Sequence, residues 1–196
     1  MKKIVIYIAG SVRKDANDAN SIFASDDVKK ELSEAIDDFE VVIFDPNESK
    51  ILGGDTDSRF GKDCLQVLSS DFLVADLREK RGLGVGAEMM LAKDKRIPVI
   101  SVCPAGSHYQ RPIVFHEGTV SPEWIHPFVR SLSDAIVNDF RAAGEWIKHF
   151  IAEPTNPKSE DIVAASIKEY MDNFFATDLD FKEQYLDSSV NRWEFK

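Results

Sequence analysis

Short apolar runs recur along the chain at intervals that suit strands separated by helices. Four of these runs are continuous rather than alternating, which is typical of strands covered on both faces in a parallel sheet. They span residues 3–9, 41–44, 71–77 and 97–102. A weaker run predicts a fifth strand near residues 125–129.

Between these runs, apolar positions recur at helical spacing and predict helices. The helices are expected over residues 26–39, over 59–69, from 87 onward and from 133 through 147, with Ser25 and Ser133 as caps. The side chains expected to face the core are Cys64, Leu65 and Leu68 in the second helix, Ala87, Met90, Leu91 and Ala92 in the third, and Ile136, Val137, Phe140 and Ile147 in the last. This alternation predicts an α/β fold of βαβ units around a doubly wound, five-stranded parallel sheet.

A short proline-containing linker over residues 154–157 follows this pattern. Beyond it, apolar residues again recur at helical spacing, at Val163, Ile167, Tyr170, Met171 and Phe174. We therefore expect a domain over residues 1–152 and a C-terminal helical extension over 153–196. Such a stripe packs on its own chain or on a second subunit.

Charge and cysteine content narrow the class of protein. The net charge of −10 over 196 residues argues against nucleic acid as a partner, although a few local donors can still hold a small anionic ligand. Cys64 and Cys103 lie singly in apolar surroundings, as in a reducing compartment. The apolar run after Met1 is too short for a signal peptide, and no stretch is long enough to span a membrane. A cytoplasmic protein is expected.

In an open parallel sheet, ligands bind beyond the carboxyl ends of the strands. Topology brings three features to that edge: the loop Gly10-Ser11-Val12-Arg13, the glycine-containing segment that leads to Glu88, and Asp63 in the preceding helix. We therefore expect Asp63, Glu88 and the first loop to lie close together.

Glu88 is expected in about the first turn of its helix, where free amides and the helix dipole favour an ionised carboxylate. An ionised carboxylate can act as a nucleophile or stabilise positive charge. Asp63 could orient it or handle a proton. The alternative is that both acids are ordinary helix-start residues, chosen for capping and solubility.

Gly82, Gly84 and Gly86 would let the backbone approach a ligand closely, or simply allow a tight turn. Their spacing matches the dinucleotide fingerprint in letters, but it follows the third strand instead of the first, so no NAD is expected. The four histidines, at positions 108, 116, 126 and 149, lack metal-binding spacing. Ser11 is not in a nucleophile elbow, and no Walker-type loop is present. We expect neither metal nor cofactor.

Three segments, taken in order, resemble the nucleoside 2-deoxyribosyltransferase superfamily, and most closely its 2'-deoxynucleoside 5'-monophosphate N-glycosidases. They are Ile6-Tyr-Ile-Ala-Gly-Ser-Val-Arg13, Asp63-Cys-Leu-Gln-Val-Leu-Ser-Ser-Asp71-Phe-Leu-Val-Ala-Asp76 and Gly82-Leu-Gly-Val-Gly-Ala-Glu88. The likeness spans roughly residues 4 to 103.

The resemblance implies a flavodoxin-like sheet and a homodimer or higher homo-oligomer. It implies that Glu88 attacks C1' of the sugar to form a glycosyl-enzyme intermediate, with Asp63 as the second carboxylate. It also implies substrate contacts from Tyr7, from the loop Gly10, Ser11, Val12 and Arg13, and from Gly82, Gly84 and Gly86. The N-glycosidases often carry a phosphate-binding serine where Gly82 stands. Here backbone amides, Arg13 or Ser107 would have to replace it.

The leading hypothesis is hydrolysis of the N-glycosidic bond of (deoxy)nucleoside 5'-monophosphates. The alternatives are a nucleoside 2-deoxyribosyltransferase that exchanges bases, and a nucleotide-binding protein without turnover. The sequence leaves open which base is accepted, whether the sugar is ribose or deoxyribose, and what residues 153–196 do.

Overall fold

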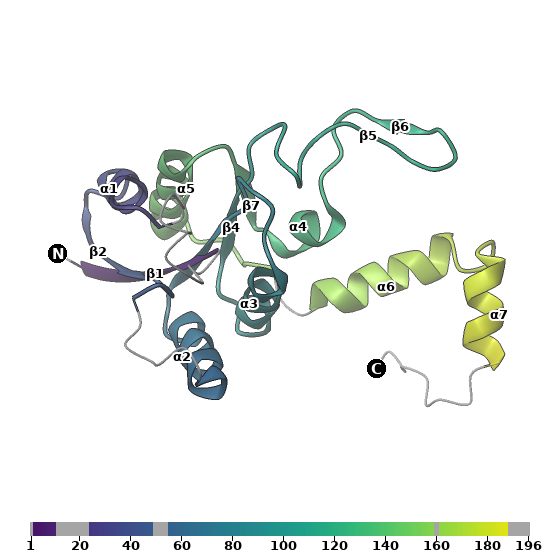
Figure 1. Ribbon diagram of the computed structural model, residues 1–196, viewed down its shortest axis with the longest axis horizontal. Coiled ribbons are helices and arrows are strands. Elements are labelled where there is room, and N and C mark those ends of the chain that lie inside the picture. The colour runs from purple at the N-terminus through teal and green to yellow at the C-terminus, as the bar shows by residue number, and fades with distance from the viewer. Residues whose placement is uncertain (1, 11–23, 49–54, 159–160, 188–196) are drawn as a thin grey trace. The chain divides into compact units, whose positions relative to one another are not determined.

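The computed structural model describes residues 2–10, 24–48, 55–158 and 161–187 (Figure 1). The chain divides into two compact units, Met1–Lys158 and Ser159–Lys196, and each is described here by itself. Within the part of the chain that is described, no helix combines the length and apolar character needed to cross a membrane.

The first unit is built on a parallel sheet of five strands in the order β2-β1-β3-β4-β7, which confirms the predicted α/β fold. The strands are β1 (Lys2–Ala9), β2 (Phe39–Phe44), β3 (Phe72–Asp76), β4 (Val99–Val102) and β7 (Ala135–Val137). The order reverses at β1, which pairs with β2 on one side and with β3 on the other. Tyr7, two residues before the end of β1, stands opposite Phe44, the last residue of β2, and Leu73, the second residue of β3.

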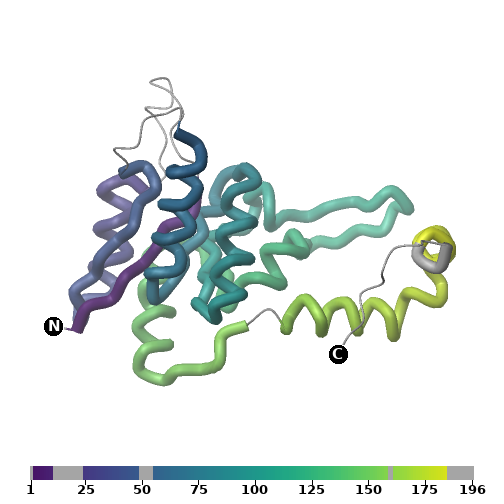
Figure 2. The backbone as a smooth tube through the Cα atoms, turned by 90° about the horizontal axis from the view of Figure 1, so that it is seen from below, coloured from purple at the N-terminus to yellow at the C-terminus, as the bar shows by residue number. Residues whose placement is uncertain are grey.

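Helices cover both faces of the sheet, as Figures 1 and 2 show. One face carries α1 (Asp26–Glu34) and α5 (Phe140–Ala152), and the other carries α2 (Thr56–Leu68), α3 (Leu83–Asp94) and α4 (Pro127–Leu132). β1 contributes side chains to the apolar core on both faces of the sheet. Because successive side chains of a strand point to opposite faces, Ile4, Ile6 and Ile8 enter the first layer, while Tyr7 and Ala9 enter the second.

The fifth strand was predicted in the wrong place. Residues 125–129 form no strand of the sheet; α4 begins there instead, with Pro127 at its first position, where the fixed φ of proline suits a helix. Ile136 and Val137 belong to β7, and Asp139 caps α5 through a 2.8 Å bond from the Ala142 amide. Ser133 does not begin a helix as predicted; it is the C-cap of α4. A hairpin of β5 (Ile113–Val114) and β6 (Val120–Ser121), which was not predicted, fills part of the preceding loop.

The inward faces of two helices also differ from expectation. In α2, Leu65 and Leu68 are 65% and 44% exposed, and Val67 is the buried apolar residue. In α3, which begins at Leu83, Ala92 is buried as predicted, but Met89 is buried instead of Met90, and Ala87 is exposed. Apolar residues occupy both sides of these helices, so periodicity alone could not select the face. The cap of α1 by Ser25 is confirmed.

The second unit contains α6 (Asp161–Asn173) and α7 (Leu179–Asp187). The apolar stripe predicted for this segment lies on α6 and the turn after it, but α6 buries none of its residues completely. Tyr170 makes ring contacts at 6.0–6.3 Å with Phe175 and Phe181, and its hydroxyl donates to Asp178 over 2.7 Å. This small aromatic cluster joins the two helices.

The contact between α1 and α5 gives a stability prediction. A methyl group at Gly144 would lie 2.5 Å from Cβ of Ala35 and 2.9 Å from the Leu32 carbonyl oxygen, whereas one at Gly61 would meet nothing within 4 Å. Gly144→Ala should lower the free energy of unfolding by about 1–2 kcal/mol, because overpacking outweighs helix propensity. Gly61→Ala should raise it by up to about 1 kcal/mol. Urea unfolding measures both, and changes of the same sign would contradict the packing described.

Candidate active site

Tyr7 and Glu88 form the central contact at the carboxyl edge of the sheet. The Tyr7 hydroxyl donates a 2.9 Å hydrogen bond to Oε1 of Glu88. Tyr7 is completely buried on β1, and Glu88 projects from α3. The second carboxylate oxygen, Oε2, is buried and has no hydrogen-bond partner among the residues the structure describes. One oxygen of Glu88 is thus oriented by the protein, and the other is left unpaired.

Glu88 lies further along its helix than predicted. Gly82 is the cap and Leu83 the first residue of α3, so Glu88 stands in the second turn, beyond the free amides of the helix start. Burial therefore dominates its electrostatics. It raises the pKa of Glu88 to about 7; the hydrogen bond from Tyr7 opposes this rise, and the charge of Asp63 adds to it. The prediction that free amides of the helix start favour the ionised form of Glu88 is wrong.

Asp63 shares this environment, as the topology predicted. Its pKa is raised by burial, while the nearby charges of Lys62 and Arg59 oppose that rise. Its charge in turn raises the pKa of Glu88 and of Tyr7, so the three side chains are close enough to influence one another. Oδ1 of Asp63 is buried and, in the described structure, accepts no hydrogen bond. Two carboxyl groups with raised pKa values therefore meet at one sheet edge.

The polar face of α2 was missed by sequence reasoning. Arg59, Lys62, Asp63 and Gln66 recur at helical spacing, and each has a buried side-chain atom without a hydrogen-bond partner in the described part of the chain. The opposite face carries exposed Phe60, Leu65 and Leu68. The signal that could have revealed this face is the polar spacing of i, i+3, i+4 and i+7 within one helix. Leu65 and Leu68 obscured it.

The three glycines before Glu88 lie at the start of α3, and all are exposed. None has a positive φ angle. A methyl group at Gly82 or Gly86 would meet nothing within 4 Å, and one at Gly84 would lie 4.0 Å from Oε1 of Glu88. The fold itself therefore does not require glycine at Gly82 or Gly86, and the surface above the helix start is open to close approach.

A buried ion-pair cluster fixes the segment before these glycines. Asp76, the last residue of β3, bonds to Arg78 and pairs with Arg81 at 2.9 Å. Burial alone would raise the pKa of Asp76, but the two arginines outweigh it and hold that pKa below its usual value. The Tyr109 hydroxyl accepts from the Arg81 amide at 2.8 Å. These contacts hold the chain where it enters α3 and thereby place Glu88.

The other predicted site residues have mixed outcomes. Gly10 follows β1 directly and is half-buried, while Ser11, Val12 and Arg13 lie outside the described residues. Ser107 is buried, and its hydroxyl contacts the Cys103 thiol at 3.4 Å, which gives no support to a role in phosphate binding. Across the described residues, no group of three or more His, Cys, Asp and Glu side chains could hold a metal ion.

The far side of α3 has a different character. An apolar cavity of about 380 Å³ lies between α3 and α4, with Tyr109 and His126 in its lining. Glu88 does not line it. Leu83 and Phe128, which do, are 93% and 66% exposed. This side of the helix therefore presents apolar surface, in contrast to the carboxylates that gather on the other.

Comparison with known proteins supports the fold. No protein-family model matches the chain, and no curated protein matches it. A solved structure of a 2-desoxiribosyltransferase from Leishmania mexicana matches with a TM-score of 0.53 at 15% identity, over 78% of this chain and 99% of that one. The Vibrio vulnificus NanR protein complexed with ManNAc-6P matches more weakly, with a TM-score of 0.34 at 13% identity over 87% and 56% of the two chains. Most of this chain therefore shares the fold of the Leishmania 2-desoxiribosyltransferase.

Proposed function

We propose that the protein hydrolyses the N-glycosidic bond of (deoxy)nucleoside 5'-monophosphates, with Glu88 as the nucleophile. The observation that carries this proposal is a buried carboxylate with one oxygen held by Tyr7, the other unpaired, and a second acid beside it. Burial makes such a group a strong partner for positive charge, because little water screens it. The sugar of a nucleoside develops that charge at C1' when the base departs.

The proposed reaction follows the two-step course of retaining glycosidases. Ionised Glu88 attacks C1' through Oε2; the new C–O bond forms as the C1'–N bond breaks, and the bonding pair leaves with the base. The departing base takes its proton from solvent, while the charge of Asp63 stabilises the positive charge that develops on the sugar. Water then attacks C1' and releases Glu88, while Asp63 takes up the water proton. Tyr7 keeps Oε1 turned toward β1 in both steps.

The transferase alternative uses the same intermediate and differs only in the acceptor. The similarity to a structure described as a 2-desoxiribosyltransferase favours this second candidate. An added free base that becomes a new nucleoside would identify transfer, and free sugar as the sole product would identify hydrolysis. A binding protein without turnover is the third candidate, and the cost to stability of burying the Glu88 carboxyl argues against it.

Glu88→Gln tests the nucleophile directly. Base release from deoxynucleoside monophosphates, followed by chromatography, should fall by at least about 1,000-fold, because an amide cannot form the intermediate. The same variant should melt at a higher temperature than wild type at pH 8. A carboxyl whose folded pKa is raised loses stability as pH rises through the range between its unfolded and folded values. That difference should vanish below pH 4. Undiminished activity would exclude Glu88 as the nucleophile.

The dependence on pH tests the role of Tyr7. With a pKa of about 7 for Glu88, kcat/KM should rise through neutral pH and level off above it, as the carboxyl ionises. The bond from Tyr7 lowers that pKa, so Tyr7→Phe should move the midpoint to higher pH. Tyr170→Phe removes a hydroxyl that donates to Asp178 instead of Glu88; it is the matched control and should leave the midpoint unchanged. A shift of the Tyr7→Phe midpoint to lower pH would contradict the assignment.

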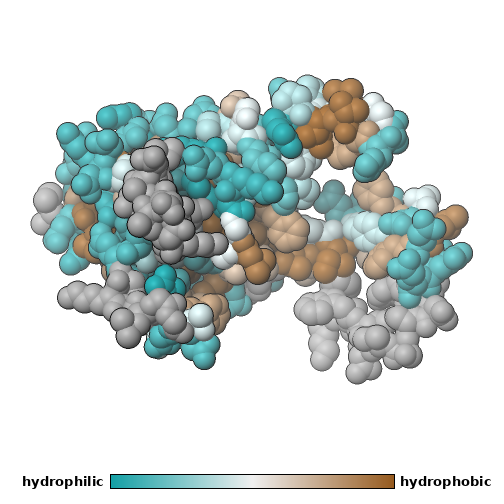
Figure 3. Space-filling view, in the orientation of Figure 1, coloured by the Kyte–Doolittle hydropathy of each residue, from teal (hydrophilic) through white to brown (hydrophobic). Residues whose placement is uncertain are grey.

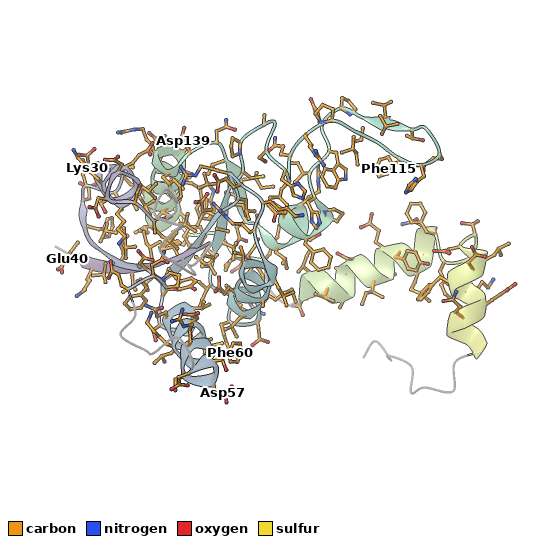
Figure 4. The ribbon with its side chains drawn as sticks, viewed as in Figure 1. Lys30, Glu40, Asp57, Phe60, Phe115 and Asp139 are labelled. Atoms are coloured by element: carbon orange, nitrogen blue, oxygen red, sulfur yellow. The ribbon has the colours of Figure 1, made fainter. Side chains whose placement is uncertain are left out.

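We further propose that the protein assembles with copies of itself through the outer faces of α2 and α3. Phe60, Leu65 and Leu83 are 70%, 65% and 93% exposed there, and Figure 4 labels Phe60 on α2. Apolar side chains also gather on the β5–β6 hairpin in Figure 3. Clusters of this kind commonly mark protein–protein contacts.

Phe60→Ser combined with Leu65→Ser should reduce the mass measured by light scattering after size exclusion, because it removes apolar area from that contact. Leu179→Ser on α7 removes a side chain of similar exposure, 62%, and should leave the mass unchanged. A wild-type protein that is monomeric, or a double variant that retains the wild-type mass, would overturn this proposal.

The compartment is part of the same proposal. Cys64 is half-buried and Cys103 buried, and both are free thiols. Free thiols persist in a reducing environment. We therefore place the protein in the cytoplasm.

A further inference from the structure

The polar and apolar faces of α2 are reversed relative to those of an ordinary amphipathic helix. Its polar side chains turn inward, and its larger apolar side chains are exposed. Nε of Arg59 and Nζ of Lys62 are buried, and among the described residues neither atom has a hydrogen-bond partner. Neither side chain forms an ion pair with a described carboxylate. A buried cationic donor without a partner costs free energy, so its position needs a physical reason.

The neighbouring acids do not supply that reason completely. Arg59 and Lys62 are close enough to lower the pKa of Asp63, yet Oδ1 of Asp63 accepts no bond in the described structure. The two cations and the two acids therefore share one environment without satisfying one another. Such an arrangement suits a ligand that has an anionic group at one end and develops positive charge at the other.

The position of the cations along α2 defines where the anionic group would lie. α2 runs antiparallel to the strands, so its first turns lie at the carboxyl edge of the sheet, where ligands bind. Arg59 lies about one helical turn, or roughly 5.4 Å, before Asp63. That spacing is comparable to the distance across a pentose from its 5'-phosphate to its anomeric carbon. The partial positive charge of the helix start favours an anion at the same end.

We propose that Arg59 and Lys62 bind the 5'-phosphate of the substrate and select nucleotides over nucleosides. This inference rests on the proposed N-glycosidic chemistry and names the residues that determine its substrate class. A chain of net charge −10 repels a phosphate at long range, so local cations are needed to hold one. Both lie close enough to Asp63 to lower its pKa, beside the place where the sugar would be attacked.

The test compares a deoxynucleoside 5'-monophosphate with the same deoxynucleoside lacking phosphate. Wild type should prefer the monophosphate, and the ratio of the two kcat/KM values should fall roughly 10- to 100-fold in Arg59→Gln combined with Lys62→Gln, since charge-assisted bonds to phosphate are lost. Each single variant should lose part of the preference for the monophosphate. The control, Lys3→Gln combined with Lys30→Gln, removes the same charge from lysines whose side chains are 58% and 71% exposed, and should keep the ratio.

Equal losses of kcat/KM on both substrates would overturn the inference, because they would mean that the cations act on Asp63 instead of binding phosphate. An unchanged ratio would overturn it as well. If wild type acts on neither substrate, the proposed function fails, and binding of inorganic phosphate decides the inference separately. Addition of inorganic phosphate should shift the NMR signals of the α2 backbone amides in wild type and in the Lys3/Lys30 control. Their persistence in the Arg59/Lys62 double variant, or their absence from wild type, would refute phosphate binding by these cations.

Discussion

The site depends on a carboxylate that is buried at the junction of β1 and α3 and held there by a tyrosine hydroxyl. The rise in the pKa of Glu88 from 4.5 to about 7 corresponds to a cost of roughly 3 kcal/mol when the group is ionised above neutral pH. The surrounding structure must offset that cost. Val85 and Met89 anchor the same helix in the second core layer, and Ile6 and Ile8 anchor the strand in the first. The core thus holds in place a group that would be more stable in water.

Much of the fold could be predicted because it is encoded in contiguous segments. β1, β3 and β4 are apolar runs that a sheet covered on both faces requires, and they appear close to where the pattern places them. β7 could not be located in the same way. It has three residues, and the longer apolar stretch before it contains Pro127, which begins α4. Three residues are too few for a strand pattern to be recognised, especially beside a longer apolar segment.

The sequence predicted those features of the candidate site that follow from sheet topology. Asp63 and Glu88 were expected to meet because their helices bring them to one edge of the sheet, and the electrostatic coupling between them agrees with that expectation. Tyr7 was predicted as a substrate contact, but its bond to Glu88 depends on side-chain geometry that the sequence pattern does not give. The boundary of α3 also mattered. Placing the helix start at Leu83 moves Glu88 from the amides of the first turn into an environment governed by burial.

α2 explains why a strong hydrophobic pattern can mislead. Leu65 and Leu68 suggested an inward apolar face, yet the structure turns Arg59, Lys62 and Gln66 inward and leaves the leucines exposed. Local hydrophobicity alone would favour the opposite orientation. What fixes α2 as observed must lie in neighbouring elements, chiefly its contact with α3 and the burial of Val67. A helix that orients charged residues against its own hydrophobic preference loses stability to do so, and functional sites are where such a loss is expected. The glycines of α3 agree with this: Gly82 and Gly86 have no steric neighbour in the protein that excludes a side chain, so the space above them is available to a ligand.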